Sequence, residues 1–145
     1  MFYDAVKTDS FWDHKWQLSA LFPSMGLSRR YHHVYDDKDI PYDAWSNIHF
    51  GVIGRYCEFS ESVLLDGADL AQRVSNFEFK DLYTFNVPEG DTLYDKSAIK
   101  IGFLIHYKYI NHNTIYADEI LSEIMNDDVF IKYFQGWKCT DDKNK

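Results

Sequence analysis

The chain has few cysteines, no long apolar run and a shortage of basic residues. Cys57 and Cys139 are its only thiols, and they form neither a CxxC pair nor a Cys/His pattern with zinc spacing. This excludes a disulfide framework or a structural zinc site as the basis of the fold. No stretch approaches the roughly 18 apolar residues that span a bilayer, and no signal peptide is evident at the start. The sequence therefore predicts a domain that is soluble by itself.

Acidic residues outnumber basic residues by 23 to 15, so the net charge is −8. The field of such a chain repels phosphate backbones, whereas nucleic-acid binders usually carry a basic patch. The only compact basic element is Arg29-Arg30, with His32 and His33 close behind. The charge counts against non-specific nucleic-acid binding, but it does not exclude a nuclease, because a few local cations can hold a substrate.

The fold that we predict is mainly α: a compact single-domain helical fold with irregular loops and one small β-hairpin. The length of 145 residues is that of one domain, so we treat 1–145 as a single domain with a frayed tail at about 140–145. Apolar periodicity and capping residues predict helices over the following segments: Ser10 to Pro23, Ser60 to Val74 with a break at Gly67, Asp95 to Ile110, the residues after Thr114, and those after Asp127 or Asp128. Residues 45–53 fit a short helix or an irregular segment, and residues 77–94 are expected to be irregular.

Candidate catalytic residues are concentrated in the run Tyr42-Asp43-Ala44-Trp45-Ser46-Asn47-Ile48-His49-Phe50-Gly51. His49 can accept and donate protons near neutral pH, and Asp43 can orient the ring or bind water. Asn47 can hold a substrate carbonyl or a developing oxyanion. Asp66 and Asp69 share one side of a helix if that segment is helical. We predict that these five residues line one cleft.

Aromatic residues make up 18% of the chain, and rings that stay partly exposed are platforms for sugars, bases or another protein. The substrate-binding residues that we predict beside the five catalytic candidates are Tyr42, Trp45, Arg55, Tyr56 and Glu61. No spacing matches a standard metal motif, so no metal ligand is assigned, and the sequence identifies no cofactor.

Each candidate also has a purely structural explanation. Asp43 after Pro41 is a natural turn former or helix cap, and Asp66 before Gly67 is ordinary turn chemistry. His49 is also compatible with a packed or surface histidine. His106, inside an apolar helical stripe, is more often a packed histidine than a ligand. Glu58 and Glu61 are carboxyl candidates for a glycosidase acid, although solvated carboxylates near a helix start explain each one equally simply.

The segment from Trp45 to Gln72 resembles the polymorphic toxin type 44 domain. The hallmark of that family is an aspartate, an aromatic-containing spacer and Asn-Ile-His-Tyr-Gly, followed by Gly-Phe-Ser and Leu-Leu-x-Gly-Ala. The chain matches it with Asp43, with Asn47, Ile48, His49 and Gly51, and with Leu64-Leu65-Asp66-Gly67-Ala68. It departs from it at Phe50, where tyrosine is usual, and at Glu58, where glycine is usual. The later run Ala98-Ile99-Lys100-Ile101-Gly102 is similar to another family segment.

The resemblance implies a C-terminal antibacterial effector, carried by a larger secreted delivery protein and neutralised by a cognate immunity protein. It implies secretion or delivery into target bacteria, and we expect action in the periplasm. Three function classes remain. We favour a hydrolase that acts on the cell envelope, peptidoglycan or its precursor, with an Asp/Asn/His centre. The alternatives are an RNase-type nuclease toxin and a non-catalytic, aromatic-rich binding module.

Overall fold

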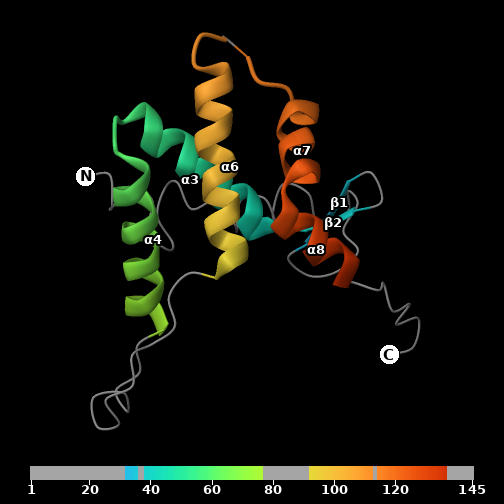
Figure 1. Ribbon diagram of the computed structural model, residues 1–145, viewed down its shortest axis with the longest axis horizontal. Helices are drawn as coiled ribbons and strands as arrows, with labels where there is room; N and C mark the ends of the chain where they lie inside the picture. The colour runs from blue at the N-terminus through green and yellow to red at the C-terminus, as the bar shows by residue number, and fades with distance from the viewer. Residues whose placement is uncertain (1–31, 36–37, 77–91, 113, 137–145) are drawn as a thin grey trace, which may run out of the picture.

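The computed structural model describes residues 32–35, 38–76, 92–112 and 114–136, and this part of the protein is mainly helical (Figure 1). An antiparallel hairpin of β1 (His32–Tyr35) and β2 (Lys38–Pro41) precedes the helices. The helices are α3 (Tyr42–Tyr56), α4 (Glu61–Asn76), α6 (Leu93–Tyr109), α7 (Ala117–Asn126) and α8 (Asp128–Gly136). The predicted fold class is confirmed. The predicted helix from Ser10, most of the segment 77–94 and the tail at 140–145 lie outside the described residues.

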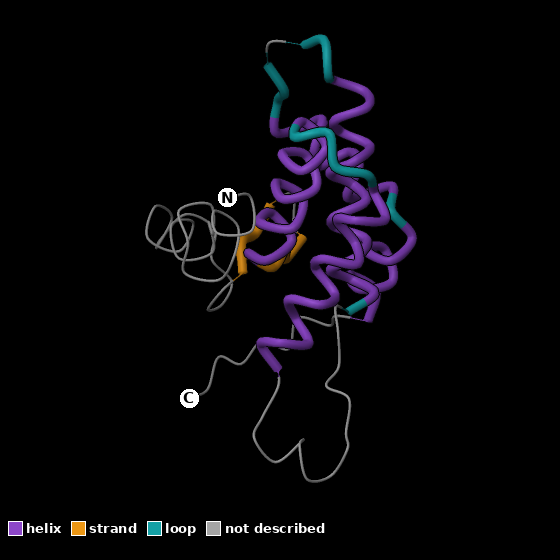
Figure 2. The backbone as a smooth tube through the Cα atoms, turned by 90° about the vertical axis from the view of Figure 1, so that its left-hand side faces the viewer, coloured by secondary structure: helices purple, strands orange, loops and turns teal. Residues whose placement is uncertain are grey.

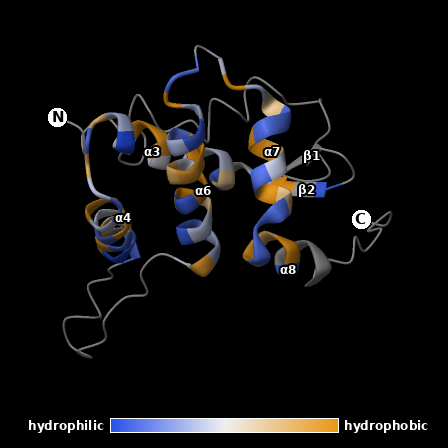
Figure 3. Ribbon diagram, turned by 45° about the horizontal axis from the view of Figure 1, so that its top comes forward, coloured by the Kyte–Doolittle hydropathy of each residue, from blue (hydrophilic) through white to orange (hydrophobic). Residues whose placement is uncertain are grey.

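The helices lie together with the two strands at their side (Figure 2), and α6 lies between α4 and α7 (Figure 1) and is buried on two sides. On one side Ile101 and Ile105 belong to a core cluster with residues of β2, α3, α7 and α8, namely Ile40, Ala44, Ile48, Leu121, Ile124 and Phe130. On the other side Ile99 and Phe103 pack with Leu64 of α4. Helices α4 and α7, which flank α6, carry apolar and polar residues side by side (Figure 3). A helix in contact with neighbours on both sides needs apolar residues around most of its circumference, and α6 has them.

Helices α3 and α6 cross at two glycines. A β-carbon on Gly51 would overlap the carbonyl oxygen of Ile99, and one on Gly102 would overlap the carbonyl oxygen of Ile48. Glycine is the residue that permits such a close backbone approach. In Figure 1, α3 passes behind α6 at this crossing. Both family-like segments, the one around His49 and the one ending at Gly102, therefore meet at one helix contact.

The helix starts follow the expected capping chemistry. Ser60 accepts a hydrogen bond from the Val63 amide at 3.3 Å, which confirms it as the cap of α4. Thr92 and Asp95 form a capping box that starts α6 at Leu93, two residues before the predicted start. Asp127 accepts from the amides of Val129 and Phe130 and caps α8.

The predicted break of α4 at Gly67 is wrong, because α4 is continuous from Glu61 to Asn76. A glycine inside a helix costs about 1 kcal/mol relative to alanine. Leu64 is buried against α6, and Leu65 and Ala68 pack beside it. The burial of one leucine side chain is worth roughly 1.5–3 kcal/mol and outweighs the cost of the glycine.

Candidate functional site

Helices α3 and α4 carry all ten predicted site residues, and helical geometry decides which of them meet. Successive residues of an α-helix are rotated by about 100°. Asn47 and His49 are two residues apart, so they project from nearly opposite sides of α3. Asp43 lies about 120° from His49 and about 9 Å along the axis. Helix α3 therefore divides the predicted Asp/Asn/His centre between two faces. The side chain of Tyr42, at the start of α3, lies outside the described residues.

The Asn47 face is turned toward the start of α6. The Asn47 amide Nδ2 donates to Asp95 Oδ1 at 2.8 Å. The other carboxylate oxygen of Asp95 accepts from the Thr92 hydroxyl at 2.6 Å. Asn47 thereby ties α3 to the capped end of α6. Asp43, one turn before Asn47, is half-buried in the first turn of α3.

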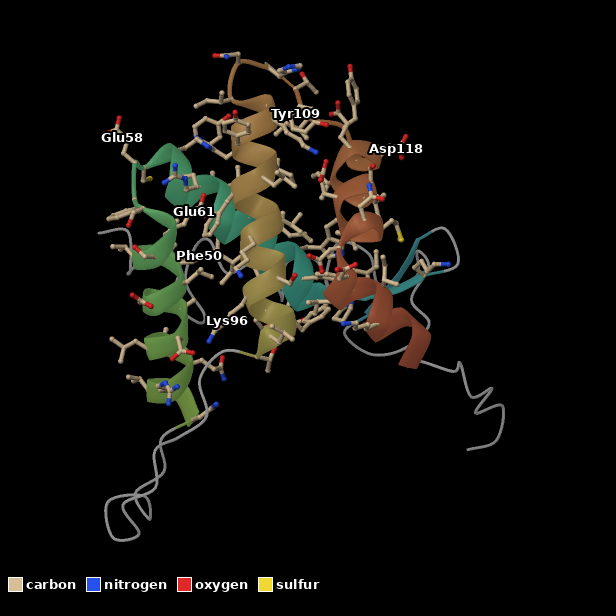
Figure 4. All side chains as sticks on the ribbon, viewed as in Figure 1. Phe50, Glu58, Glu61, Lys96, Tyr109 and Asp118 are labelled. Carbon is tan, nitrogen blue, oxygen red and sulfur yellow. The ribbon has the colours of Figure 1, made fainter. Side chains whose placement is uncertain are left out.

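Asp69 is engaged in ion pairs at the boundary of α4 and α6. Its carboxylate binds Lys96 Nζ at 2.8 Å and Arg73 Nε at 2.7 Å. The hydrogen bond from Lys96, followed by that from Arg73, lowers the pKa of Asp69 from 3.8 to about 2. Lys96 projects from α6 toward α4 (Figure 4). Asp66 and Glu61, by contrast, are exposed on α4. The two aspartates three residues apart thus have different surroundings, one paired and one solvated.

His49 shares its face of α3 with two of the predicted aromatic residues. Trp45, His49 and Tyr56 lie within about 40° of one another around the helix axis. Trp45 is partly buried against the main core cluster, and His49 is half-buried. Tyr56, two turns beyond His49, is 47% exposed. The structure therefore brings the imidazole together with an aromatic surface rather than with Asn47.

A second histidine, His106 of α6, extends this face. Its ring packs edge-on against Tyr56, with centroids 4.6 Å apart. Burial, and secondly the positive charge of Arg55, lower the pKa of His106 below its usual 6.5. Arg55 Nη1 also donates to the carbonyl of Phe59 at 2.6 Å. The sequence predicts a packing role for His106, because an apolar helical stripe does not show that the histidine ring will contact Tyr56.

The loop after α3 contains a left-handed residue. Glu58 has φ 65°, a conformation that favours glycine. This is the position at which the type 44 pattern has glycine, so the backbone has kept the glycine conformation although the residue has changed. In Figure 4 Glu58 lies at the tip of the connection between α3 and α4.

The described residues contain no group of three or more His, Cys, Asp or Glu side chains arranged to hold a metal ion. Within the same ranges no helix is both long and apolar enough to cross a membrane. Two imidazoles can supply acid–base chemistry here: His106 packs on Tyr56 within the influence of the Arg55 charge, and His49 lies about two turns earlier on the same face of α3 as Tyr56.

Comparison with known proteins agrees with the sequence pattern. The family model described as bacterial toxin 44 matches residues 1–109, which is most of the chain. No curated protein and no solved structure matches the chain. The match includes both family-like segments, which the fold joins at the crossing of Gly51 and Gly102. The chain therefore belongs to the bacterial toxin 44 family and is a toxin effector domain.

Proposed function

We propose that this toxin domain is a hydrolase that acts on the bacterial cell envelope, on peptidoglycan or its precursor. The observation that carries the proposal is the face of α3 on which His49 lies between Trp45 and Tyr56. Aromatic rings with one exposed side are flat platforms on which sugar rings stack. An imidazole between two such rings is placed to move a proton at a bond held against them.

In this proposal His49 acts as the general base toward an attacking water, or as the acid toward the leaving group. Asp43 lies about 120° around α3 and about 9 Å along it from His49, so in this proposal it binds a polar group of the substrate and does not act on the imidazole. Asn47 and Asp69 hold α3 and α4 in position on α6 through Asp95 and Lys96. They act through the scaffold and do not touch the substrate.

Two further features support an envelope target. The net charge of −8 repels the phosphate backbone of RNA, whereas it exerts no such repulsion on uncharged sugar rings. Membership of a toxin family fits delivery into target bacteria from a larger secreted protein. Neutralisation by a cognate immunity protein and action in the periplasm complete the proposal.

The test is growth of a bacterial host that expresses the domain with or without a periplasmic signal peptide. We expect killing only from the periplasm, with loss of killing in His49→Ala. The matched control is His112→Ala, because His112 is an exposed histidine whose ring packs edge-on against Tyr109. It should kill as wild type does. Killing by His49→Ala, with the variant folded, would refute the catalytic role of His49, and harmlessness in both compartments would favour a binding module.

The second candidate is an RNase-type toxin, and the contact of Tyr56 with His106 favours it specifically. Cleavage of RNA by its 2′-hydroxyl needs a base, an acid and a cation for the phosphate. His106 and Arg55 lie together at Tyr56, and His49 lies about two turns before Tyr56 on α3, so these three residues supply groups of the required types. Incubation of the purified domain with labelled RNA distinguishes the candidates. Cleavage that is lost in both His49→Ala and His106→Gln would replace the envelope proposal, whereas intact RNA would exclude the nuclease.

A further inference from the structure

Arg55, in the last turn of α3, is a cation with no acidic partner in the described part of the chain. Its Nη1 donates to the Phe59 carbonyl at 2.6 Å, whereas its Nε and Nη2 donate to none of the described residues. Glu58 and Glu61 follow it closely in the chain, but both are exposed and neither forms an ion pair with it within the described ranges. One edge of a planar guanidinium is therefore open to an anion.

The backbone holds this guanidinium in place. The connection after α3 turns back on the helix, because the Glu58 amide donates to the Arg55 carbonyl at 3.0 Å and the Phe59 amide donates to the Gly54 carbonyl at 3.1 Å. The Phe59 carbonyl that accepts from the guanidinium thus belongs to a closed turn. A side chain that is positioned before its ligand arrives loses less conformational entropy on binding than a mobile one.

An aromatic ring and an imidazole lie beside the guanidinium. Tyr56 is 47% exposed, although the ring of His106 packs edge-on against it with centroids 4.6 Å apart. Burial, and secondly the positive charge of Arg55, lower the pKa of His106, so the guanidinium and the imidazole influence each other. An exposed ring next to a guanidinium suits a ligand that combines a flat apolar face with a negative group.

We propose that Arg55, Tyr56 and His106 form a binding site for a sugar that carries a carboxylate. The carboxylate accepts two hydrogen bonds from the open edge of the guanidinium, the sugar ring stacks on Tyr56, and His106 supports that ring from its other neighbour, α6. One carboxylate balances one guanidinium charge, whereas a polyanion such as RNA meets the repulsion of a domain with net charge −8. The inference deepens the envelope proposal and rests on it, because that proposal makes a glycan the substrate.

The test compares two sugars that differ by a carboxylate. N-acetylmuramic acid is N-acetylglucosamine with a lactic acid group attached through an ether, and N-acetylglucosamine itself is the uncharged counterpart. Each is titrated into the domain while the histidine ring signals are followed by NMR. N-acetylmuramic acid should bind at least about tenfold more tightly than N-acetylglucosamine. It should also raise the pKa of His106, because a bound carboxylate offsets the charge of Arg55.

Arg55→Gln should abolish the preference between the two sugars. Arg55→Lys should retain only part of it, because lysine keeps the charge but lacks the planar fork. The matched control is Lys132→Gln, which removes the same charge from an exposed position of α8 and should bind both sugars as the wild type does. Equal binding of the two sugars by the wild type, or an unchanged preference in folded Arg55→Gln, overturns the proposal. So does inorganic phosphate that binds at Arg55 more tightly than N-acetylmuramic acid, because the site is then one for phosphate.

This binding measurement separates the sugar site from the hydrolase activity. His49 lies about two turns before Tyr56, so the His49→Ala variant should keep the sugar preference while it loses killing. A domain that kills from the periplasm but binds both sugars equally would refute the carboxylate site alone. A domain that prefers N-acetylmuramic acid but never kills from the periplasm would support the site and refute the hydrolase.

Discussion

Gly51 of α3 and Gly102 of α6 face each other at the helix crossing so closely that a β-carbon on either would overlap the backbone of the other helix. The atoms that would be struck are carbonyl oxygens of Ile99 and Ile48, which cannot move aside as the end of a flexible side chain can. The contact sets how α3 lies on α6. It also sets where the His49 face of α3 is presented.

Alanine at either glycine of the crossing should destabilise the protein. Gly51→Ala and Gly102→Ala should each lower the free energy of unfolding by about 1–3 kcal/mol, since overpacking forces the helices apart. Gly67→Ala is the matched control, because its new methyl group meets open space. It should raise stability by about 0.5–1 kcal/mol through helix propensity. Urea unfolding checks all three, and a stable Gly102→Ala would contradict the close crossing.

Asn47→Ala should cost about 1–2 kcal/mol, because it removes a hydrogen bond to the carboxylate of Asp95 in a partly buried place. Asn47→Asp should cost more, since it sets two carboxylates against each other. Toxicity per folded molecule should survive Asn47→Ala if the residue serves the scaffold. A folded Asn47→Ala variant without toxicity would instead indicate that Asn47 has a catalytic role.

The ion pairs of Asp69 should make stability fall in acid. Its pKa is lowered in the folded state from 3.8 to about 2, so the stabilisation is present above pH 3.8 and is lost as the pH falls toward 2. Asp69→Asn should flatten this part of the curve of unfolding free energy against pH. Asp66→Asn, at an exposed carboxylate on the same helix, should leave it as in the wild type. Parallel curves for wild type and Asp69→Asn would rule out the pairing.

His106 should produce a second pH dependence, at higher pH. Burial and Arg55 lower its pKa in the folded state below 6.5, so the unfolded chain binds the proton more readily. Stability should therefore fall as the pH drops from 6.5 through the pKa of the folded state. His106→Gln should remove that component, and NMR titration of the histidine rings should give His106 a pKa below 6.5. A pKa of 6.5 or above would contradict the burial against Tyr56.

Glu58→Gly should stabilise the protein by about 0.5–1 kcal/mol, because Glu58 has φ 65° and a side chain disfavours that conformation. The matched control is Glu61→Gly in the first turn of α4, where glycine should cost up to about 1 kcal/mol. Thermal unfolding of the two variants compares them directly. A loss of stability in Glu58→Gly would show that the carboxylate makes a contact worth more than the strain.

Much of the secondary structure was predictable because its signals are local. Ser60 and Asp127 cap helices wherever their neighbours take helical dihedral angles, and periodic apolar residues mark α6 and α7. The predicted break at Gly67 is wrong because glycine has a low helix propensity, and the sequence does not show that the burial of Leu64 outweighs this cost. Residues 45–53 fit either a helix or an irregular segment by sequence, because it is the packing of α3 against α6 that holds them in a helix.

The sequence predicts candidate residue types for the site, but it does not predict how their side chains are arranged. Family membership and the candidates Asp43, Asn47 and His49 follow from a short motif, in which order and spacing carry the information. Their grouping in one cleft does not follow, because residues two apart in a helix point in opposite directions. The pairing of Asn47 with Asp95, Asp69 with Lys96 and Tyr56 with His106 joins positions from 27 to about 50 residues apart. Such contacts depend on how the helices pack, and packing is a property of the whole set of side chains rather than of any local run.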